Sequence, residues 1–267
     1  LYVREESGGA GLTRLDAAVV FEALSTGCPV TAAFLSIHNM VAWMIDRWGS
    51  EAQRAEHLPA LVTMERIASY CLTEPGSGSD AVALRTRAVR DNSGYVLNGS
   101  KQFISGAGAS DLYLTMVRTG GEGPDGISAL LVPKDAVGLS FGANERKMGW
   151  NAQPTRMMTF EDARVSADTL LGEEGQGFRM AMAGLDGGRL NIAACSIGGA
   201  QRALDIALDY VRDRRAFGKP VSDFQATQFR LADMATELEA ARSLLWRACA
   251  KLDSKAPDAG AFCAMAK

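Results

Sequence analysis

The stretch of sequence best suited to bind a ligand is Tyr70–Asp80, which reads Tyr-Cys-Leu-Thr-Glu-Pro-Gly-Ser-Gly-Ser-Asp. It starts as an apolar strand and continues into a loop of small residues. Its glycines, Gly76 and Gly78, would allow the backbone to approach a bound molecule closely. The loop also contains three hydroxyl side chains, which can donate or accept hydrogen bonds: Thr73, Ser77 and Ser79. Taken alone, the same composition is also typical of an ordinary β-turn.

Two other segments could complement this loop. In Lys101-Gln-Phe-Ile-Ser105, the ring of Phe103 precedes the hydroxyl of Ser105 by two residues, so both side chains would point to the same face of a strand. An aromatic surface beside a hydroxyl suits a flat heteroaromatic ligand. The second segment, Arg212–Pro220, is a cationic helix end whose arginines match phosphate oxygens. It could equally be a solvated terminus that complements the helix dipole.

Several common catalytic arrangements are absent from the sequence. The only histidines, His38 and His57, lie in the first helical segment, and without a GxSxG motif they do not indicate a serine triad. We expect them to be structural or surface residues. Gly106-Ala-Gly108 lacks the third glycine of a dinucleotide-binding fingerprint, and there is no Walker A lysine. The five cysteines form no CxxC pair, so they indicate neither a zinc site nor a disulfide scaffold.

The composition sets broad limits on function. The 267 residues have a formal net charge of −3 and are 47% hydrophobic, and a chain of this length can bury a sizeable core without disulfides or metals. The slight negative charge argues against nonspecific binding to nucleic acid. No apolar run approaches the roughly 18 residues that a membrane span requires. Scattered cysteines of this kind are typical of a reducing compartment.

The hydrophobic pattern changes twice along the chain and predicts an α+β fold of three parts. Helical periodicity dominates residues 1–68, short apolar runs separated by turn residues occupy 69–170, and helical periodicity returns over 171–267. The middle part is expected to be a small antiparallel sandwich or barrel. Its candidate strands are 86–90, 95–97, 112–117, 127–132 and 155–160.

The expected helices have recognisable ends and one weak interior. A helix over about 176–213 would contain two glycine pairs, 187–188 and 198–199. Each glycine weakens a helix by about 1 kcal/mol, so tertiary packing must stabilise this one. An apolar stripe from Leu231 to Leu252 suits packing in a helical bundle. The expected N-terminal caps are Thr13 with Asp16, Ser50 with Gln53, and Ser222 with Gln225.

In combination and order, four segments resemble the acyl-CoA dehydrogenase family over nearly the whole chain. They are Tyr70–Asp80, Asn98–Ser105, Phe160–Val165 and Tyr210–Pro220. The resemblance implies an N-terminal helical domain over 1–68, a middle β domain over 69–170 and a C-terminal helical bundle over 171–267, the first and last of them partial. It also implies that FAD binds between the β domain and the bundle, and that the protein forms a homotetramer.

The family pattern implies roles for individual residues. Thr73 would hydrogen-bond the flavin ring, Phe103 would lie against it, and Ser105 would sit near its reactive nitrogen edge. Many members have Trp and Thr at the last two positions. The residues implied to bind the cofactor are Tyr70, Cys71, Leu72, Thr73, Gly78, Ser79, Phe103, Ile104, Ser105, Arg214, Phe217 and Gln225. The last three would reach the FAD of a neighbouring subunit. Those implied to contact the acyl-CoA are Ser79, Asp186 and Arg189.

The resemblance also implies a reaction. Members of the family use a desolvated glutamate to remove the α-proton of a thioester while the β-hydride passes to the flavin. This implies dehydrogenation of a short or branched acyl-CoA to its trans-2-enoyl-CoA, with electrons passed to an electron-transfer flavoprotein. Residues 148–155 and 187–195 are most similar to the branch that acts on isobutyryl-CoA in valine degradation. The implied location is the mitochondrial matrix in a eukaryote or the cytoplasm in a bacterium.

No glutamate in the sequence matches the expected catalytic base. A minority of members have the base where Gly188 stands, and most have it in a later glutamate–glycine turn. We therefore expect the base beyond Lys267, and expect the sequence to be a fragment that is inactive alone. The glutamates that match no catalytic position are Glu173, Glu174, Glu237 and Glu239. Two alternatives remain: an acyl-CoA oxidase or flavin monooxygenase on the same fold, and a non-catalytic scaffold. We expect no metal, nucleic acid or membrane partner.

Overall fold

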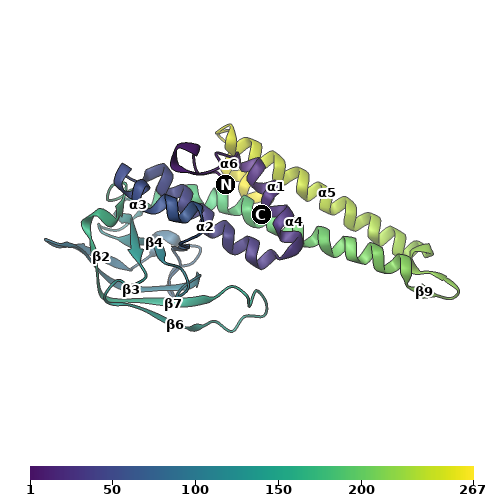
Figure 1. The fold of residues 1–267 in the computed structure, drawn as a ribbon, viewed down its shortest axis with the longest axis horizontal. Helices are drawn as coiled ribbons and strands as arrows, with labels where there is room; N and C mark the ends of the chain where they lie inside the picture. Colours follow the sequence, from purple (N-terminus) through teal and green to yellow (C-terminus); the bar gives the residue numbers. More distant parts are fainter. The chain divides into compact units, whose positions relative to one another are not determined.

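The computed structural model describes residues 1–267, which fall into two compact units (Figure 1). Unit 1 comprises residues 1–12 and 37–185, and unit 2 comprises residues 13–36 and 186–267. The order of helices, then strands, then helices confirms the expected α+β fold. The helices are α1 (Arg14–Gly27), α2 (Pro29–Trp48), α3 (Glu51–Val62), α4 (Gly177–Asp213), α5 (Gln225–Asp253) and α6 (Ala259–Ala266). None of them is long and apolar enough to cross a membrane.

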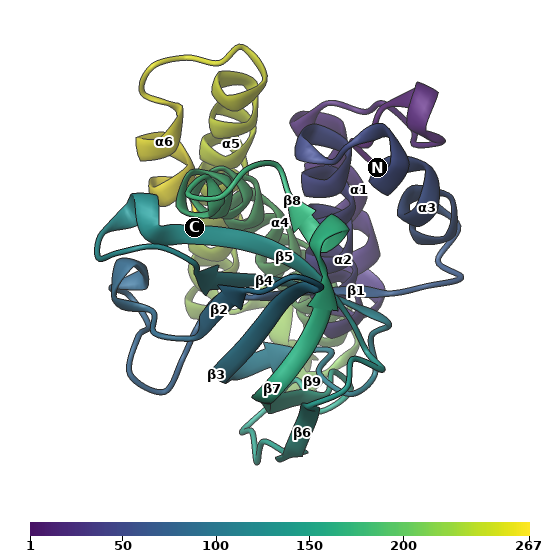
Figure 2. The same cartoon turned by 90° about the vertical axis from the view of Figure 1, so that its left-hand side faces the viewer.

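Unit 1 is built around a sheet in the order β6-β7-β3-β2-β4-β5-β8, with β1 paired to β4 (Figure 2). The pairing is mostly antiparallel, as expected, but β1 and β2 both pair with β4 in parallel. The strands are β1 (Ala68–Cys71), β2 (Arg87–Arg90), β3 (Gly94–Ser105), β4 (Leu112–Arg118), β5 (Ile127–Pro133), β6 (Leu139–Asn144), β7 (Thr155–Ser166) and β8 (Leu170–Leu171). All five candidate strands from the sequence are present, β1 contains the apolar strand start expected at Tyr70, and β6 and β8 are additional.

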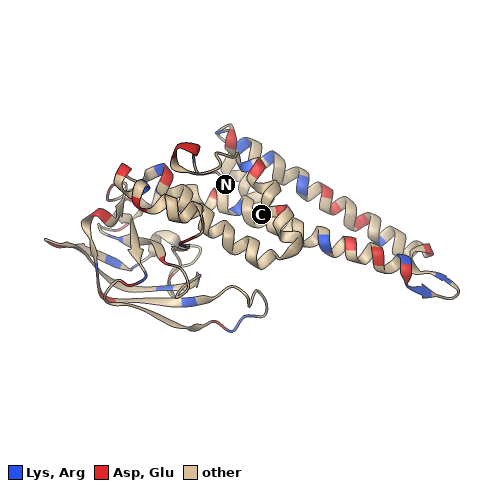
Figure 3. Cartoon of the chain, in the orientation of Figure 1, with Lys and Arg blue, Asp and Glu red and all other residues tan.

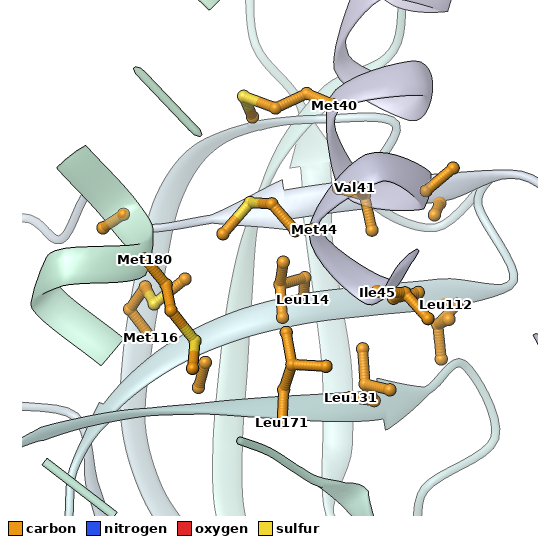
Figure 4. Packing of buried hydrophobic residues seen from close by; sticks show 14 of the residues in the cluster. Met40, Val41, Met44, Ile45, Leu112, Leu114, Met116, Leu131, Leu171 and Met180 are labelled. Carbon is orange, nitrogen blue, oxygen red and sulfur yellow. The ribbon is translucent and has the colours of Figure 1, made fainter. Parts of the chain in front are cut away.

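The sheet of unit 1 buries apolar side chains on both faces because its strands alternate. Along β4, Leu114 packs with Met44 of α2 in one cluster, whereas the adjacent Tyr113 packs with Leu130 of β5 in another. Figure 4 shows the first cluster, in which residues from α2, β4 and β5 meet Met180 near the start of α4. Each fully buried side chain of this size contributes about 1.5–3 kcal/mol. The two clusters therefore fix the sheet from both sides.

In unit 2, helix α4 approaches α1 so closely that glycine is required at position 198. A Cβ built at Gly198 would lie 2.1 Å from the backbone oxygen of Glu22, whereas one at Gly187 would lie 2.4 Å from Nη1 of Arg14, the end of a flexible side chain. The packing that these glycines permit is what supports the intrinsically weak helix, as expected. Helix α5 also contacts α1, because Arg242 donates a hydrogen bond to Glu22 over 2.8 Å.

The helix caps agree with the sequence in two cases out of three. Capping boxes form at Thr13 with Asp16 and at Ser50 with Gln53, as expected. The third expectation was wrong: Ser222 lies in a short 3₁₀ turn, and α5 begins at Gln225 after Phe224, which forms no side-chain cap. The turn itself supplies the first hydrogen bonds, since the backbone oxygen of Phe224 accepts from the N–H groups of Thr227 and Gln228.

The apolar stripe of α5 is covered along only part of its length. Leu245 and Ala248 are fully buried, but Met234 and the neighbouring Phe229 are exposed. The bundle seam expected from Leu231 to Leu252 is thus formed within this chain only near the C-terminal end of α5.

His38 has a structural role that determines its tautomer. Its Nδ1 accepts a hydrogen bond from the backbone N–H of Ala68 over 3.0 Å, and its Nε2 lies 2.8 Å from the backbone oxygen of Leu61. Because Nδ1 must accept, the proton of the neutral ring is on Nε2, where it donates to Leu61. A second proton on Nδ1 would oppose the N–H of Ala68. The imidazole therefore joins α2 to the start of β1 only when it is neutral.

This arrangement predicts a loss of stability at mildly acidic pH. Burial lowers the pKa of His38 below its ordinary value of 6.5, although its hydrogen bond to Leu61 opposes the shift. As the pH falls below 6.5, the unfolded chain binds a proton at His38 and the folded chain does not, so the free energy of unfolding decreases until the folded-state pKa is reached. Urea unfolding of wild type and His38→Gln between pH 5 and 7.5 should show a smaller pH dependence in the variant. Burial also lowers the pKa of His57, so His57→Gln measures the separate contribution of that residue. Equal slopes for wild type and His38→Gln would contradict the assignment.

Candidate functional site

The loop predicted to bind a ligand follows β1 and lies beside the end of β3. The backbone oxygen of Thr73 accepts a hydrogen bond from the N–H of Gln102 over 2.8 Å, which joins the loop to β3. Within β1, Ser69 Oγ donates a hydrogen bond to the backbone oxygen of Ser105, at the end of β3, over 2.6 Å. The structure therefore brings together the two segments that the sequence singled out in this part of the chain.

The loop has a rigid base and an open surface. Glu74 and Ser77 exchange two backbone hydrogen bonds of 2.9 and 3.1 Å, and the buried hydroxyl of Ser77 donates to the backbone oxygen of Asp80 over 2.6 Å. Gly76 and Gly78, by contrast, face open space, since a Cβ at either position would meet nothing within 4 Å. The predicted contact residue Ser79 is also exposed. A bound molecule could thus reach the loop backbone directly.

A buried ion pair supports the base of this loop. Lys101 on β3 is 0% exposed, and its Nζ donates to Glu74 over 2.7 Å and to the backbone oxygen of Leu72 over 3.0 Å. Burial alone would raise the pKa of Glu74, but the charge of Lys101 and the hydrogen bonds hold that pKa below its ordinary value. The carboxylate also accepts from the N–H groups of Arg85 (2.6 Å) and Thr86 (2.9 Å). One side-chain pair therefore connects three segments of backbone. Sequence reasoning assigned no role to either residue.

Phe103 breaks the regular alternation expected for β3. Its backbone is left-handed, with φ +57°, and the register with β7 shifts between Lys101 and Ile104. The strand alternation that we expected to place Phe103 and Ser105 on one face is therefore interrupted at Phe103. The ring of Phe103 is 60% exposed, whereas Ile104 is buried in the sheet core. A left-handed phenylalanine is strained by about 1 kcal/mol or more, and strain of this kind clusters at functional sites.

Ser105 has a partner that the sequence did not reveal. Nε2 of Gln153, which is 5% exposed, donates a hydrogen bond to Ser105 Oγ. The other atom of that amide, Oε1, is buried and has no hydrogen-bond partner. Gln153 is 48 residues from Ser105 in the sequence, and although it lies in the segment 148–155, nothing in that segment indicates that it pairs with Ser105.

The side chains of Tyr70 and Cys71 point to different surroundings. Cys71 is fully buried with Met158 in the sheet core, and burial raises the pKa of its thiol to about 12. It could contact a ligand only through its backbone. The hydroxyl of Tyr70 is buried without a hydrogen-bond partner, and burial raises the pKa of Tyr70 above its ordinary range.

The predicted residues of unit 2 form two separate groups. Asp186 and Arg189 make an ion pair of 2.5 Å on α4, and a Cβ at Gly260 of α6 would lie 3.6 Å from Asp186. The second group lies at the far end of α4. Counted at 1.5 Å per residue, Arg189 and the end of the helix are roughly 36 Å apart, so one small ligand cannot contact both groups in a single chain.

The second group surrounds a small hairpin of β9 (Arg215–Ala216) and β10 (Lys219–Pro220). At its tip, Phe217 is 96% exposed and left-handed, with φ +53°. Its ring meets Phe224 edge-on at 6.2 Å between centroids. Figure 3 shows a group of basic residues at this hairpin and charges of both signs along α4 and α5. The other predicted residues, Arg214 and Gln225, are exposed on either side of it.

Comparison with known proteins places the whole chain in one family. Residues 1–65, 69–163 and 175–267 match the N-terminal, middle and C-terminal domains of acyl-CoA dehydrogenases. The mitochondrial isobutyryl-CoA dehydrogenase of Dictyostelium discoideum is 59% identical over 100% of this chain and 64% of that protein. The chain thus spans slightly less than two thirds of the length of this curated relative.

Solved structures of this family have the same fold as this chain. Butyryl-CoA dehydrogenase from Megasphaera elsdenii has a TM-score of 0.95 and 38% identity, covering 99% of this chain and 70% of that one. A structure described as the FAD complex of PigA has a TM-score of 0.94 and 32% identity, again over 99% and 70%. The chain belongs to the acyl-CoA dehydrogenase family.

Proposed function

We propose that the natural protein containing this chain is an FAD-dependent dehydrogenase that converts a short or branched acyl-CoA to its trans-2-enoyl-CoA. The main structural support is the exposed, left-handed Phe103, which precedes the buried Ile104 and the Ser105 hydroxyl. These residues lie beside an open glycine loop. This arrangement offers a flat apolar surface together with hydrogen-bonding groups. The preference for isobutyryl-CoA rests on the 59% identity to the Dictyostelium enzyme.

The residues of unit 1 fit a flavin. Gly76 and Gly78 leave space next to the loop backbone, and Ser79 is exposed beside them. We propose that the backbone from Tyr70 to Leu72 and the hydroxyl of Thr73 hold the flavin ring. Phe103 would cover one face of the ring. When bound, FAD supplies the acceptor for the hydride that leaves the acyl chain.

The protein's own contribution is to bind, orient and exclude water. Ser79 and Arg189 are proposed to contact the acyl-CoA, and the ion pair with Asp186 fixes the position of the Arg189 guanidinium. Proton removal from the α-carbon requires a desolvated carboxylate. Glu174 accepts from the Tyr95 hydroxyl over 2.6 Å and Glu239 pairs with Arg242, so both already have other partners. We propose that the base lies outside residues 1–267 of the natural protein, since the curated relative is longer than this chain.

The hairpin suggests a role for a second subunit. Arg214 and Phe217 are exposed at the hairpin, and we propose that they bind the flavin of a neighbouring copy, as the family resemblance implies. A homotetramer would bring such sites together. An electron-transfer flavoprotein is the proposed acceptor of the electrons, in the mitochondrial matrix of a eukaryote or the cytoplasm of a bacterium.

The test uses the intact natural protein. We expect a flavin absorbance spectrum after purification and faster turnover of isobutyryl-CoA than of straight chains of six or more carbons, with an electron-transfer flavoprotein as acceptor. A protein that neither contains nor takes up FAD would refute the cofactor assignment. Turnover that consumes oxygen without an acceptor protein would favour an oxidase or monooxygenase. Bound FAD without turnover of any acyl-CoA would favour a scaffold.

A further inference from the structure

We propose that Gln153 is a positioning residue that orients the Ser105 hydroxyl, so that its proton points toward the bound flavin. This inference rests on the proposed function, and it gives a role toward the flavin to Gln153, which lies in the segment 148–155 that the sequence links only to the substrate. The main observation behind it is the hydrogen bond from the buried amide of Gln153 to the hydroxyl of Ser105, two residues after Phe103.

The hydroxyl of Ser105 has a limited hydrogen-bonding capacity. Serine Oγ has one proton to donate and two lone pairs that accept. Nε2 of Gln153 donates to Oγ and so occupies a lone pair. The proton of Ser105 must then point elsewhere, and Ser105 Oγ donates no hydrogen bond to a protein acceptor in the structure. The amide thus leaves the hydroxyl as a donor for a ligand.

The loop around Gln153 is held firmly enough to fix this geometry. Nζ of Lys147 donates to three oxygens of the loop: Trp150 O at 2.7 Å, Gln153 O at 2.5 Å and Thr155 Oγ1 at 3.0 Å. The backbone oxygen of Pro154 also accepts from the N–H of Gly106 over 2.8 Å, directly after Ser105. Two sets of hydrogen bonds therefore fix the loop on both sides of the Gln153 side chain.

The second observation is the unpaired half of the amide. Oε1 of Gln153 is buried and lacks a donor. A buried acceptor without a partner is costly, and an apolar side chain of the same size would avoid that cost. An amide at this position is therefore not explained by stability alone, whereas a role toward a ligand would explain it. In our proposal, the amide orients the Ser105 hydroxyl so that the hydroxyl can donate a hydrogen bond to the flavin.

The opposite orientation of the amide makes the opposite prediction. If Oε1 faced Ser105, the hydroxyl would donate to it and could not donate to a ligand. Removal of the amide would then free the Ser105 proton and strengthen flavin binding. The direction of the change on removing the amide consequently decides between the two orientations.

The experiment compares Gln153→Met, Ser105→Ala and the double variant in the intact flavoprotein. The apoprotein of Gln153→Met should melt at the same temperature as wild type or higher, because an unpaired acceptor has been removed. Its dissociation constant for FAD should rise about threefold to tenfold, the worth of one hydrogen bond, with a shift of the visible flavin band. Ser105→Ala should have the same effect, and the double variant should bind FAD no more weakly than Ser105→Ala.

Two control variants test whether the changes in FAD binding are specific to the Gln153 amide and the Ser105 hydroxyl. Asn151→Ala, an exposed change in the same loop, should leave melting and FAD binding unchanged, and Ser105→Thr should retain most of the affinity because it keeps a hydroxyl. If Gln153→Met does not fold, Gln153→Asn, which withdraws the amide by one methylene, takes its place. Unchanged or tighter FAD binding, or losses that add in the double variant, would overturn the inference. A wild-type protein that binds no FAD would instead refute the proposed function.

Discussion

Glu74→Leu is expected to lower the free energy of unfolding by about 3–5 kcal/mol, the usual cost of removing one partner from a buried ion pair. The substitution leaves Lys101 without its carboxylate in a fully buried position. It also removes the acceptor for the N–H groups of Arg85 and Thr86. Urea unfolding of wild type and variant measures the change directly.

A double variant distinguishes unpaired charge from lost packing. Lys101→Met with Glu74→Gln removes both charges but keeps an acceptor oxygen for only one of the two backbone N–H groups, because Arg85 and Thr86 bind different oxygens of Glu74. Its stability should therefore fall by about 1–3 kcal/mol, which is less than the loss in Glu74→Leu. Arg164→Met is the control, because its ion pair with Asp91 is exposed and should contribute less than about 1 kcal/mol. A double variant as unstable as Glu74→Leu would show that the charges are not the cause.

Gly198→Ala is expected to destabilise the helical unit by about 2 kcal/mol. The added methyl would lie 2.1 Å from the backbone oxygen of Glu22 and 2.8 Å from Cβ of Ser25, so α1 and α4 must separate. Overpacking of this kind costs about 3 kcal/mol at the upper end of its usual range. The higher helix propensity of alanine returns about 1 kcal/mol of that loss.

Gly27→Ala provides the matched control for this substitution. A Cβ at Gly27 meets nothing within 4 Å, so the same chemical change at the end of α1 should be neutral or stabilise by up to about 1 kcal/mol. Thermal and urea unfolding of both variants would give the comparison. If the two variants lose stability equally, close packing of α4 on α1 is not the reason for Gly198.

Most of the fold could be predicted because its signals are local. The change from helical to alternating periodicity, the capping residues of α1 and α3, and the glycines of α4 are all visible in short windows of sequence. The family motifs identified the Tyr70–Asp80 loop and the Lys101–Ser105 segment, which the structure joins through Thr73 and Gln102.

The remaining features depend on residues far apart in the sequence. Nothing near Lys101 reveals that Glu74 will face it across the loop, and nothing near Gln153 marks it as the partner of Ser105. The left-handed backbone of Phe103 was missed because phenylalanine rarely adopts it, so strand periodicity was the natural expectation. The domain boundaries at 68 and 170 and the ligand roles of the site residues stay predictions.

The start of α1 is completed by a residue from the far end of the sequence. Asp253 accepts hydrogen bonds from the N–H groups of Arg14 (2.8 Å) and Leu15 (3.2 Å), and the first pair is separated by 239 residues. On a ribosome that adds about 5–20 residues per second, α1 would wait about 12–48 s for this partner. Residues 37–185 of unit 1 emerge during that interval. The order of synthesis therefore allows the sheet to assemble first, while the apolar face of α1 around Phe21 waits for the later helices of its own unit.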